Sequence, residues 1–126
     1  MVTIPVSVGE LIDKYSILQV KKANVPLDKM ENVHREMRAL AGTVSKFLSI
    51  DAISVLYEDL IGINSQLWTV EDKLRVLEKE VTFDQNFITL ARSVYHLNDE
   101  RFSIKNKINI LTDSDIKEVK HYIDYK

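Results

Sequence analysis

The sequence is poor in the residues that form covalent crosslinks, tight turns and phosphate-binding loops. Its 126 residues include no cysteine, three glycines and two prolines. The absence of cysteine excludes disulfides, thiolate metal sites and cysteine nucleophiles, and it fits a reducing cytoplasm. So few glycines leave no material for the loops of dinucleotide-binding and P-loop folds. We therefore expect no redox enzyme, no dinucleotide or P-loop fold, and no cofactor.

Long apolar runs and an excess of one charge are also missing. No stretch approaches the roughly 18 consecutive apolar residues of a membrane-spanning helix, and the first residues do not resemble a signal peptide. The 17 basic and 19 acidic residues are mixed along the chain and give a formal net charge of −2. No broad positive face is therefore available for a nucleic-acid backbone. We expect a cytoplasmic protein with no membrane span and no nucleic-acid partner.

Helical periodicity is what the sequence has in abundance. In residues 53–77 and again in residues 83–111, apolar side chains recur at alternating steps of three and four. This is the spacing of a helix seam, and strands do not produce it. A third seam of the same kind runs through residues 30–47, so at least three long helices are expected.

Capping signals divide the chain into helices. Ser7 with Glu10, and Thr82 with Gln85, have the spacing of a capping box, and Pro26 suits a first helical turn. A polar break at residues 112–114 is followed by apolar residues at helical spacing. These signals predict helices over about residues 8–22, 26–47, 51–79 and 82–111, and a short last helix from Asp115.

Short connections force successive helices to lie antiparallel. We therefore predict an all-α, antiparallel up-down bundle of four main helices plus a short C-terminal helix, built as one domain over residues 1–126. Its spine is the long hairpin of the third and fourth helices, each roughly 40 Å long. The first helix is expected to bury Val8, Leu11, Tyr15 and Leu18. The hairpin is expected to be longer than the first helix, so part of its apolar seam stays uncovered. Such an uncovered seam favours a homodimer.

A single charged residue, Arg101, occupies the seam of the fourth helix. A buried guanidinium must be paired, and Glu71 and Asp99 are the candidate partners. One interpretation is a satisfied polar network that fixes the helix register. The other is a ligand site in which cations hold an anion and aromatic rings face a sugar. The candidate ligand-binding residues are Asn64, Trp68, Glu71, Arg92, Tyr95, Asn98, Asp99, Arg101 and Lys105.

Motifs for catalysis or metal binding are absent or incomplete. Glu31 and His34 have the Glu-x-x-His spacing of di-metal bundles, but such a site needs a second copy that the sequence lacks. No serine or threonine stands in a nucleophile motif. We expect no metal site and no catalytic residue.

Several segments are similar to a bacterial family of small helical proteins classed as a domain of unknown function. They span nearly the whole chain: Pro5–Lys14, Leu67–Arg75, Leu90–Arg101, Ile104–Asn109 and Glu118–Tyr122. The resemblance implies a role near surface polysaccharide and lipopolysaccharide synthesis, because genes for these pathways often neighbour members of that family. By position it implies motif residues at Glu10, Asp13, Lys14, Trp68, Glu71, Asp72, Arg92, Tyr95, Asn98, Asp99, Arg101 and Lys105.

Two functions follow as hypotheses. The preferred one is a non-enzymatic helical module that binds a protein partner or an anionic saccharide-related ligand in a surface-polysaccharide pathway. The alternative is a small helical-bundle enzyme of the chorismate-mutase type, in which cations clamp a dicarboxylate. An enzyme needs a closed pocket with at least two converging cations, whereas a binding module needs an accessible groove.

Overall fold

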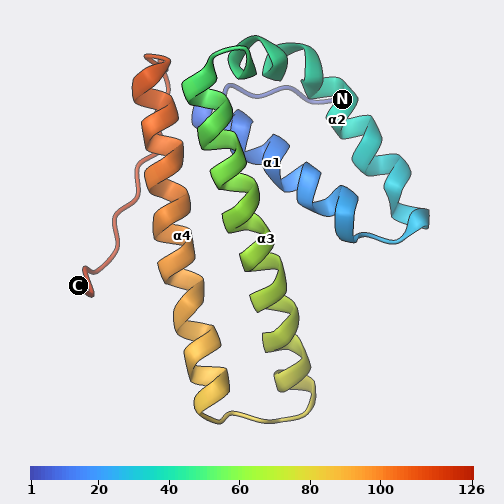
Figure 1. Ribbon diagram of the computed structural model, residues 1–126, viewed down its shortest axis with the longest axis vertical. Coiled ribbons are helices and arrows are strands. Elements are labelled where there is room, and N and C mark those ends of the chain that lie inside the picture. Colours follow the sequence, from blue (N-terminus) through green and yellow to red (C-terminus); the bar gives the residue numbers. More distant parts are fainter.

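A computed structural model describes all residues, 1–126, and shows four helices joined by short connections. They are α1 (Val8–Asn24), α2 (Leu27–Leu48), α3 (Asp51–Lys79) and α4 (Gln85–Leu111). Successive helices run in opposite directions, and the α3–α4 hairpin extends well beyond α1 and α2 (Figure 1). The predicted all-α bundle is thereby confirmed. No helix is both long and apolar enough to span a bilayer.

The first turn of α1 is satisfied by polar groups from two parts of the chain. Ser7 caps the helix, since its side-chain oxygen accepts from the Glu10 amide at 3.0 Å. The Val8 amide donates to Ser114 Oγ at 3.1 Å, and the Gly9 amide donates to Asn109 Oδ1 at 2.7 Å. These amides have no partner within the helix, so the contacts hold the start of α1 against the end of α4.

The turn between α3 and α4 differs from the predicted one. Asp84, and not Thr82, caps α4, because Asp84 Oδ1 accepts from the Phe87 amide at 3.0 Å. Val81 lies in the left-handed region with φ 52°, which ends α3 and moves the start of α4 towards Gln85. The capping box of Thr82 and Gln85 was therefore wrong, because a cap also depends on the backbone path before it.

The apolar core lies where α1 crosses the upper half of the hairpin. It is formed by the buried side chains of Ile12, Val44, Ile53, Tyr57, Leu60, Ile63, Ile104 and Ile108. α1 contacts all three other helices, whereas α2 does not contact α4. Leu67 and Leu97 pack against this core. Further down the hairpin, no residue of α3 after Leu67 or of α4 before Leu97 is fully buried.

The buried stripe of α1 is rotated from the predicted apolar face. Leu18 is buried as predicted, and Gly9, Ile12, Asp13 and Ser16 are buried too, whereas Val8, Leu11 and Tyr15 are only half buried beside the core. Small and polar side chains sit on this stripe because the backbones approach closely there. A Cβ atom on Gly9 would lie 2.9 Å from Asn109 Oδ1 and 3.1 Å from the Lys105 carbonyl carbon.

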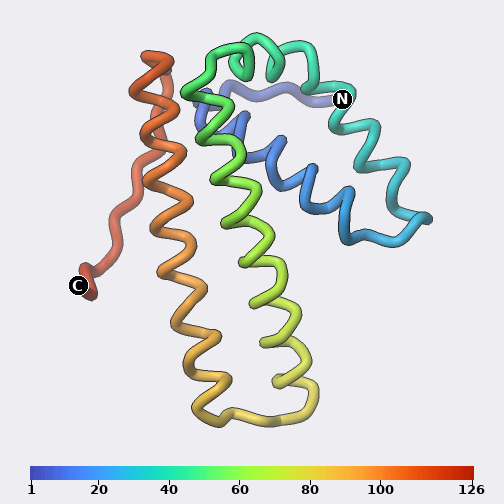
Figure 2. Tube along the Cα trace, viewed as in Figure 1, coloured from blue at the N-terminus to red at the C-terminus, as the bar shows by residue number.

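The predicted short helix from Asp115 is wrong, because residues 112–126 contain no helix. Asp113 adopts a left-handed conformation, φ 48°, and the chain turns back along α4 as an extended segment (Figure 2). About a dozen residues are too few for a helix that is stable without packing. Here the segment instead contacts α4 through side chains at Glu118 and Lys120.

Candidate functional site: a groove between α4 and the C-terminal segment

Asp13 is the centre of a buried polar cluster that joins α1, α3 and α4. Its side chain is fully buried. Oδ1 accepts from Arg101 Nε at 2.9 Å and from Asn64 Nδ2 at 3.1 Å, and Oδ2 accepts from Arg101 Nη2. Ser16 Oγ accepts from Asn64 at 2.8 Å. We call Asp13, Ser16, Asn64 and Arg101 the Asp13 cluster; it is a satisfied network of the kind that fixes helix positions.

Lys105 lies one turn after Arg101 on α4. Its side chain connects the Asp13 cluster to carboxylates nearer the solvent. Its Nζ is 2.7 Å from Glu10 Oε2, 2.7 Å from Glu118 Oε2 and 4.0 Å from Asp13 Oδ2. The Lys105 side chain is 7% exposed, whereas the Glu118 side chain is 39% exposed. Two cations and three carboxylates therefore meet here, and each charge has a partner.

The pairing holds these groups in their charged forms. The hydrogen bonds from Arg101 to Asp13 raise the Arg101 pKa. Burial lowers the pKa of Lys105, but hydrogen bonds to Glu10 and Glu118 outweigh burial and leave the pKa raised. At the far end of the C-terminal segment, the hydrogen bond from Tyr125 lowers the pKa of Asp99, and it raises the pKa of Tyr125 to about 12.

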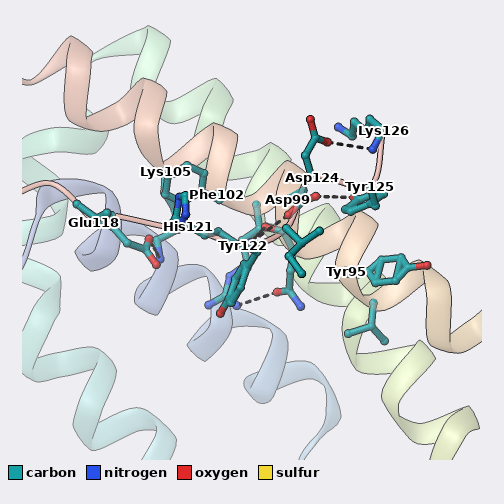
Figure 3. A pocket seen from close by; sticks show the side chains of 16 residues that line it. Tyr95, Asp99, Phe102, Lys105, Glu118, His121, Tyr122, Asp124, Tyr125 and Lys126 are labelled. Carbon is teal, nitrogen blue, oxygen red and sulfur yellow. Dashed lines mark hydrogen bonds and ion pairs between the residues drawn. The ribbon is translucent and has the colours of Figure 1, made fainter.

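A groove of about 1160 Å³ lies over this ionic surface, between α4 and the C-terminal segment (Figure 3). Aromatic side chains and hydrogen-bonding groups alternate along it. Tyr95 packs against Tyr125, with ring centroids 4.9 Å apart, and the Lys120 amine lies 5.7 Å from the Phe102 ring centroid. The lining is Val94, Tyr95, Asn98, Asp99, Arg101, Phe102, Lys105 and residues 118–126.

The structure brings together five of the nine candidate residues in this groove, namely Tyr95, Asn98, Asp99, Arg101 and Lys105. Asn64 lies behind the groove in the Asp13 cluster. The remaining three do not line the groove. Trp68 is half buried on α3, Glu71 forms an exposed 3.9 Å pair with Arg75, and exposed Arg92 donates to the Tyr95 hydroxyl at 3.4 Å.

The predicted partners of Arg101 were wrong. Glu71 pairs with Arg75, and Asp99 contacts Lys120 at 3.2 Å and also Tyr125. Arg101 is instead paired with Asp13, because α1 crosses the hairpin at that level. Helical spacing on α3 and α4 contains no information about this crossing.

Sequence reasoning also missed the residues that the C-terminal segment contributes. Glu118, Lys120, Tyr122 and Tyr125 line the groove, whereas the segment was assigned to a helix. The resemblance did carry a signal, because its shared segments include residues 118–122 and its motif positions include Glu10 and Asp13. Phe102 has the helical spacing of Tyr95, Asn98 and Lys105 along α4, so that spacing is the signal that indicates it.

Comparisons with known proteins identify a family but no activity. The model of a family of unknown function, DUF6165, matches residues 2–125. This confirms the resemblance to a family of unknown function. No curated protein and no solved structure matches the chain.

Proposed function

The chain belongs to DUF6165, a family of unknown function, and we propose that it is a non-enzymatic binding module for a saccharide-related ligand. The observation that carries the proposal is the groove along α4, which gathers five residues that were selected for ligand chemistry. The implied pathway is surface polysaccharide synthesis, and the implied location is the cytoplasm. Both of these stay predictions that rest on the resemblance and on the absence of cysteine.

The lining of the groove suits a sugar better than a purely apolar ligand. Sugar rings pack on aromatic faces, and Tyr95 and Phe102 of α4 supply two. Sugar hydroxyls need donors and acceptors, which Asn98 and Asp99 supply beside these rings. Ligand sites typically combine apolar walls with a few such polar groups.

Binding can be tested with a pair of asparagine variants on one helix. Asn98 lines the groove, whereas Asn86 is exposed about 18 Å away along α4. We expect titration of wild type with monosaccharides and uronic acids to shift the backbone resonances of residues 95–105. Asn98→Ala should weaken binding about fivefold or more, the effect of one lost hydrogen bond, and Asn86→Ala should not. No resonance shift with any sugar would refute the proposal.

The lower half of the hairpin supports the expected homodimer. We call residues 68–96 the distal hairpin; it protrudes beyond α1 and α2 (Figure 1). Its seam residues stay half buried, and Val76, Val81, Phe83 and Ile88 are exposed. Exposed apolar side chains gathered on one element often mark an interaction surface. A second hairpin placed on it would complete a four-helix arrangement.

Two valines on α3 give a matched test of this dimer. Val76 lies in the distal hairpin and Val55 lies outside it, and they are 54% and 61% exposed. A buried lysine without a partner is costly, so Val76→Lys should lower the dimerisation affinity at least tenfold, whereas Val55→Lys should not. Sedimentation velocity over a concentration series measures both. A wild type that stays monomeric at high concentration would rule out the dimer.

The enzyme alternative receives less support from the geometry. A dicarboxylate clamp of the chorismate-mutase type needs two cations that face the substrate. Arg101 and Lys105 converge, but each is paired with carboxylates of the chain itself. The groove beside them is open to solvent and not closed. These features favour a binding module.

A further inference from the structure

The C-terminal segment is attached to α4 mainly by polar contacts. Glu118 contacts Lys105 at 2.7 Å and Lys120 contacts Asp99 at 3.2 Å. By contrast, its side chains at Val119, Tyr122 and Ile123 are 79–93% exposed, although Tyr125 packs against Tyr95 and His96 of α4. Burial of apolar surface therefore contributes little to holding residues 115–126 in place. If a ligand replaced these ionic contacts with its own, residues 115–126 would be released from α4.

Of the two carboxylates that lie 2.7 Å from Lys105 Nζ, only Glu118 belongs to a segment that contains no helix. Glu10 belongs to the first turn of α1, where Ser7 caps the helix and Ser114 and Asn109 bind its amides. Glu118 belongs to a segment without secondary structure and reaches Lys105 from the groove side (Figure 3). The contact of Glu118 with Lys105 thus marks the place where an external carboxylate would fit.

We propose that Glu118 occupies the carboxylate subsite of the groove, and that a sugar with a single carboxylate, a uronic acid, displaces it and the segment that carries it. The inference rests on the proposed function and names its ligand class. Residues 115–126 act as a strap that lies along this face of α4 when no ligand is present.

The carboxylate contacts of buried Lys105 select this ligand class. With Glu118 in place, Arg101 and Lys105 face the carboxylates of Glu10, Asp13 and Glu118. A uronic acid replaces one carboxylate with another, so Lys105 keeps two carboxylates within hydrogen-bonding distance. A sugar phosphate, which carries up to two negative charges near neutral pH, would add charge beside Glu10 and Asp13. A neutral sugar would leave buried Lys105 without one of its partners.

The first experiment measures the position of the strap without any ligand. Because the chain has no cysteine, Ile123→Cys provides a single attachment point for a spin label. The label should broaden the amide resonances of α4 near Asn98 in the wild-type background. Glu118→Ala should reduce this broadening. Asp115→Ala, which removes another exposed carboxylate from the same segment, should leave it unchanged.

The second experiment measures binding of glucuronate, glucose and glucose 6-phosphate to the unlabelled proteins. Removal of the internal competitor should strengthen glucuronate binding by about three- to tenfold in Glu118→Ala and not in Asp115→Ala. Glucose and glucose 6-phosphate should both bind more weakly than glucuronate. Glucuronate should also reduce the label's broadening in the wild-type background.

The outcomes separate the strap from the binding function. Equal glucuronate affinity in wild type and Glu118→Ala would overturn the subsite while leaving saccharide binding intact. Unchanged broadening in Glu118→Ala would overturn the strap. Binding of none of the three sugars by any variant would overturn the ligand class, and with it the proposed function, even if the strap moves.

Discussion

Gly9 is the position where one added carbon atom should cost the most. Its amide donates to Asn109 Oδ1 at 2.7 Å. A Cβ atom there would lie 2.9 Å from that oxygen, 3.1 Å from the Lys105 carbonyl carbon, and closer still to the Lys105 carbonyl oxygen. Ordinary contacts begin at 3.4 Å, so α1 must move away from α4. Gly42 and Gly62 have no such neighbours within 4 Å.

The structure therefore predicts opposite signs for the same substitution. Gly9→Ala incurs about 1–3 kcal/mol of overpacking and weakens a buried hydrogen bond worth about 1 kcal/mol. The higher helix propensity of alanine offsets about 1 kcal/mol of this cost. The net loss in the free energy of unfolding is therefore about 1–3 kcal/mol. Gly62→Ala has only the propensity term, a gain of about 0.5–1 kcal/mol. A neighbouring helix thus approaches closely at Gly9 and not at Gly62.

Urea unfolding followed by circular dichroism measures both changes at one protein concentration. With a slope of about 2 kcal/mol per molar urea, Gly9→Ala should lower the midpoint by about 0.5–1.5 M. Gly62→Ala should raise it by about 0.25–0.5 M. A Gly9→Ala protein as stable as wild type would refute the close approach of α1 and α4. So would an equal loss in both variants, which would indicate a general effect of the substitution.

Other residues give further predictions. Asp13→Asn should lower the free energy of unfolding by about 2–4 kcal/mol, because Arg101 loses its buried partner; exposed Asp59→Asn should change it by under about 0.5 kcal/mol in the same urea assay. Ser7→Ala should cost about 1 kcal/mol through the lost cap. Burial raises the pKa of Tyr57 to about 12. The neutral Tyr57 phenol therefore makes its full contribution to stability below pH 10, and that contribution is lost as the pH rises towards 12. In an absorbance titration, Tyr57→Phe should remove one late-ionising tyrosine, and removal of an early one instead would contradict the burial.

The fold was predictable to a large extent because its signals are local. Seam periodicity identified α2, α3 and α4, and Ser7 marked the start of α1. The predicted last helix shows where such local signals are not sufficient. Residues 116, 119 and 123 have helical spacing, yet periodicity indicates a helix only where a surface is available to cover the apolar stripe. No helix packs over those side chains here, and they are exposed.

The candidate site was predictable only in part. The spacing along α4 selected Tyr95, Asn98, Asp99, Arg101 and Lys105, since residues three and four apart share a helix face. The same reasoning on α3 selected Trp68 and Glu71, which lie outside the groove. A helix face can be read from one segment, but which neighbour covers that face cannot.

The sequence by itself determined the helices, their short connections and hence their antiparallel order, because periodicity, caps and loop lengths act over a few residues. Only the tertiary structure decided the pairing of Arg101 with Asp13, 88 residues away, and of Lys105 with Glu118. A charged side chain on a helix seam needs a partner of opposite charge, but the sequence contains several carboxylates and does not indicate which of them is the partner. The crossing of α1 and the return of the C-terminal segment along α4 make the choice, because they fix which carboxylates come within bonding distance.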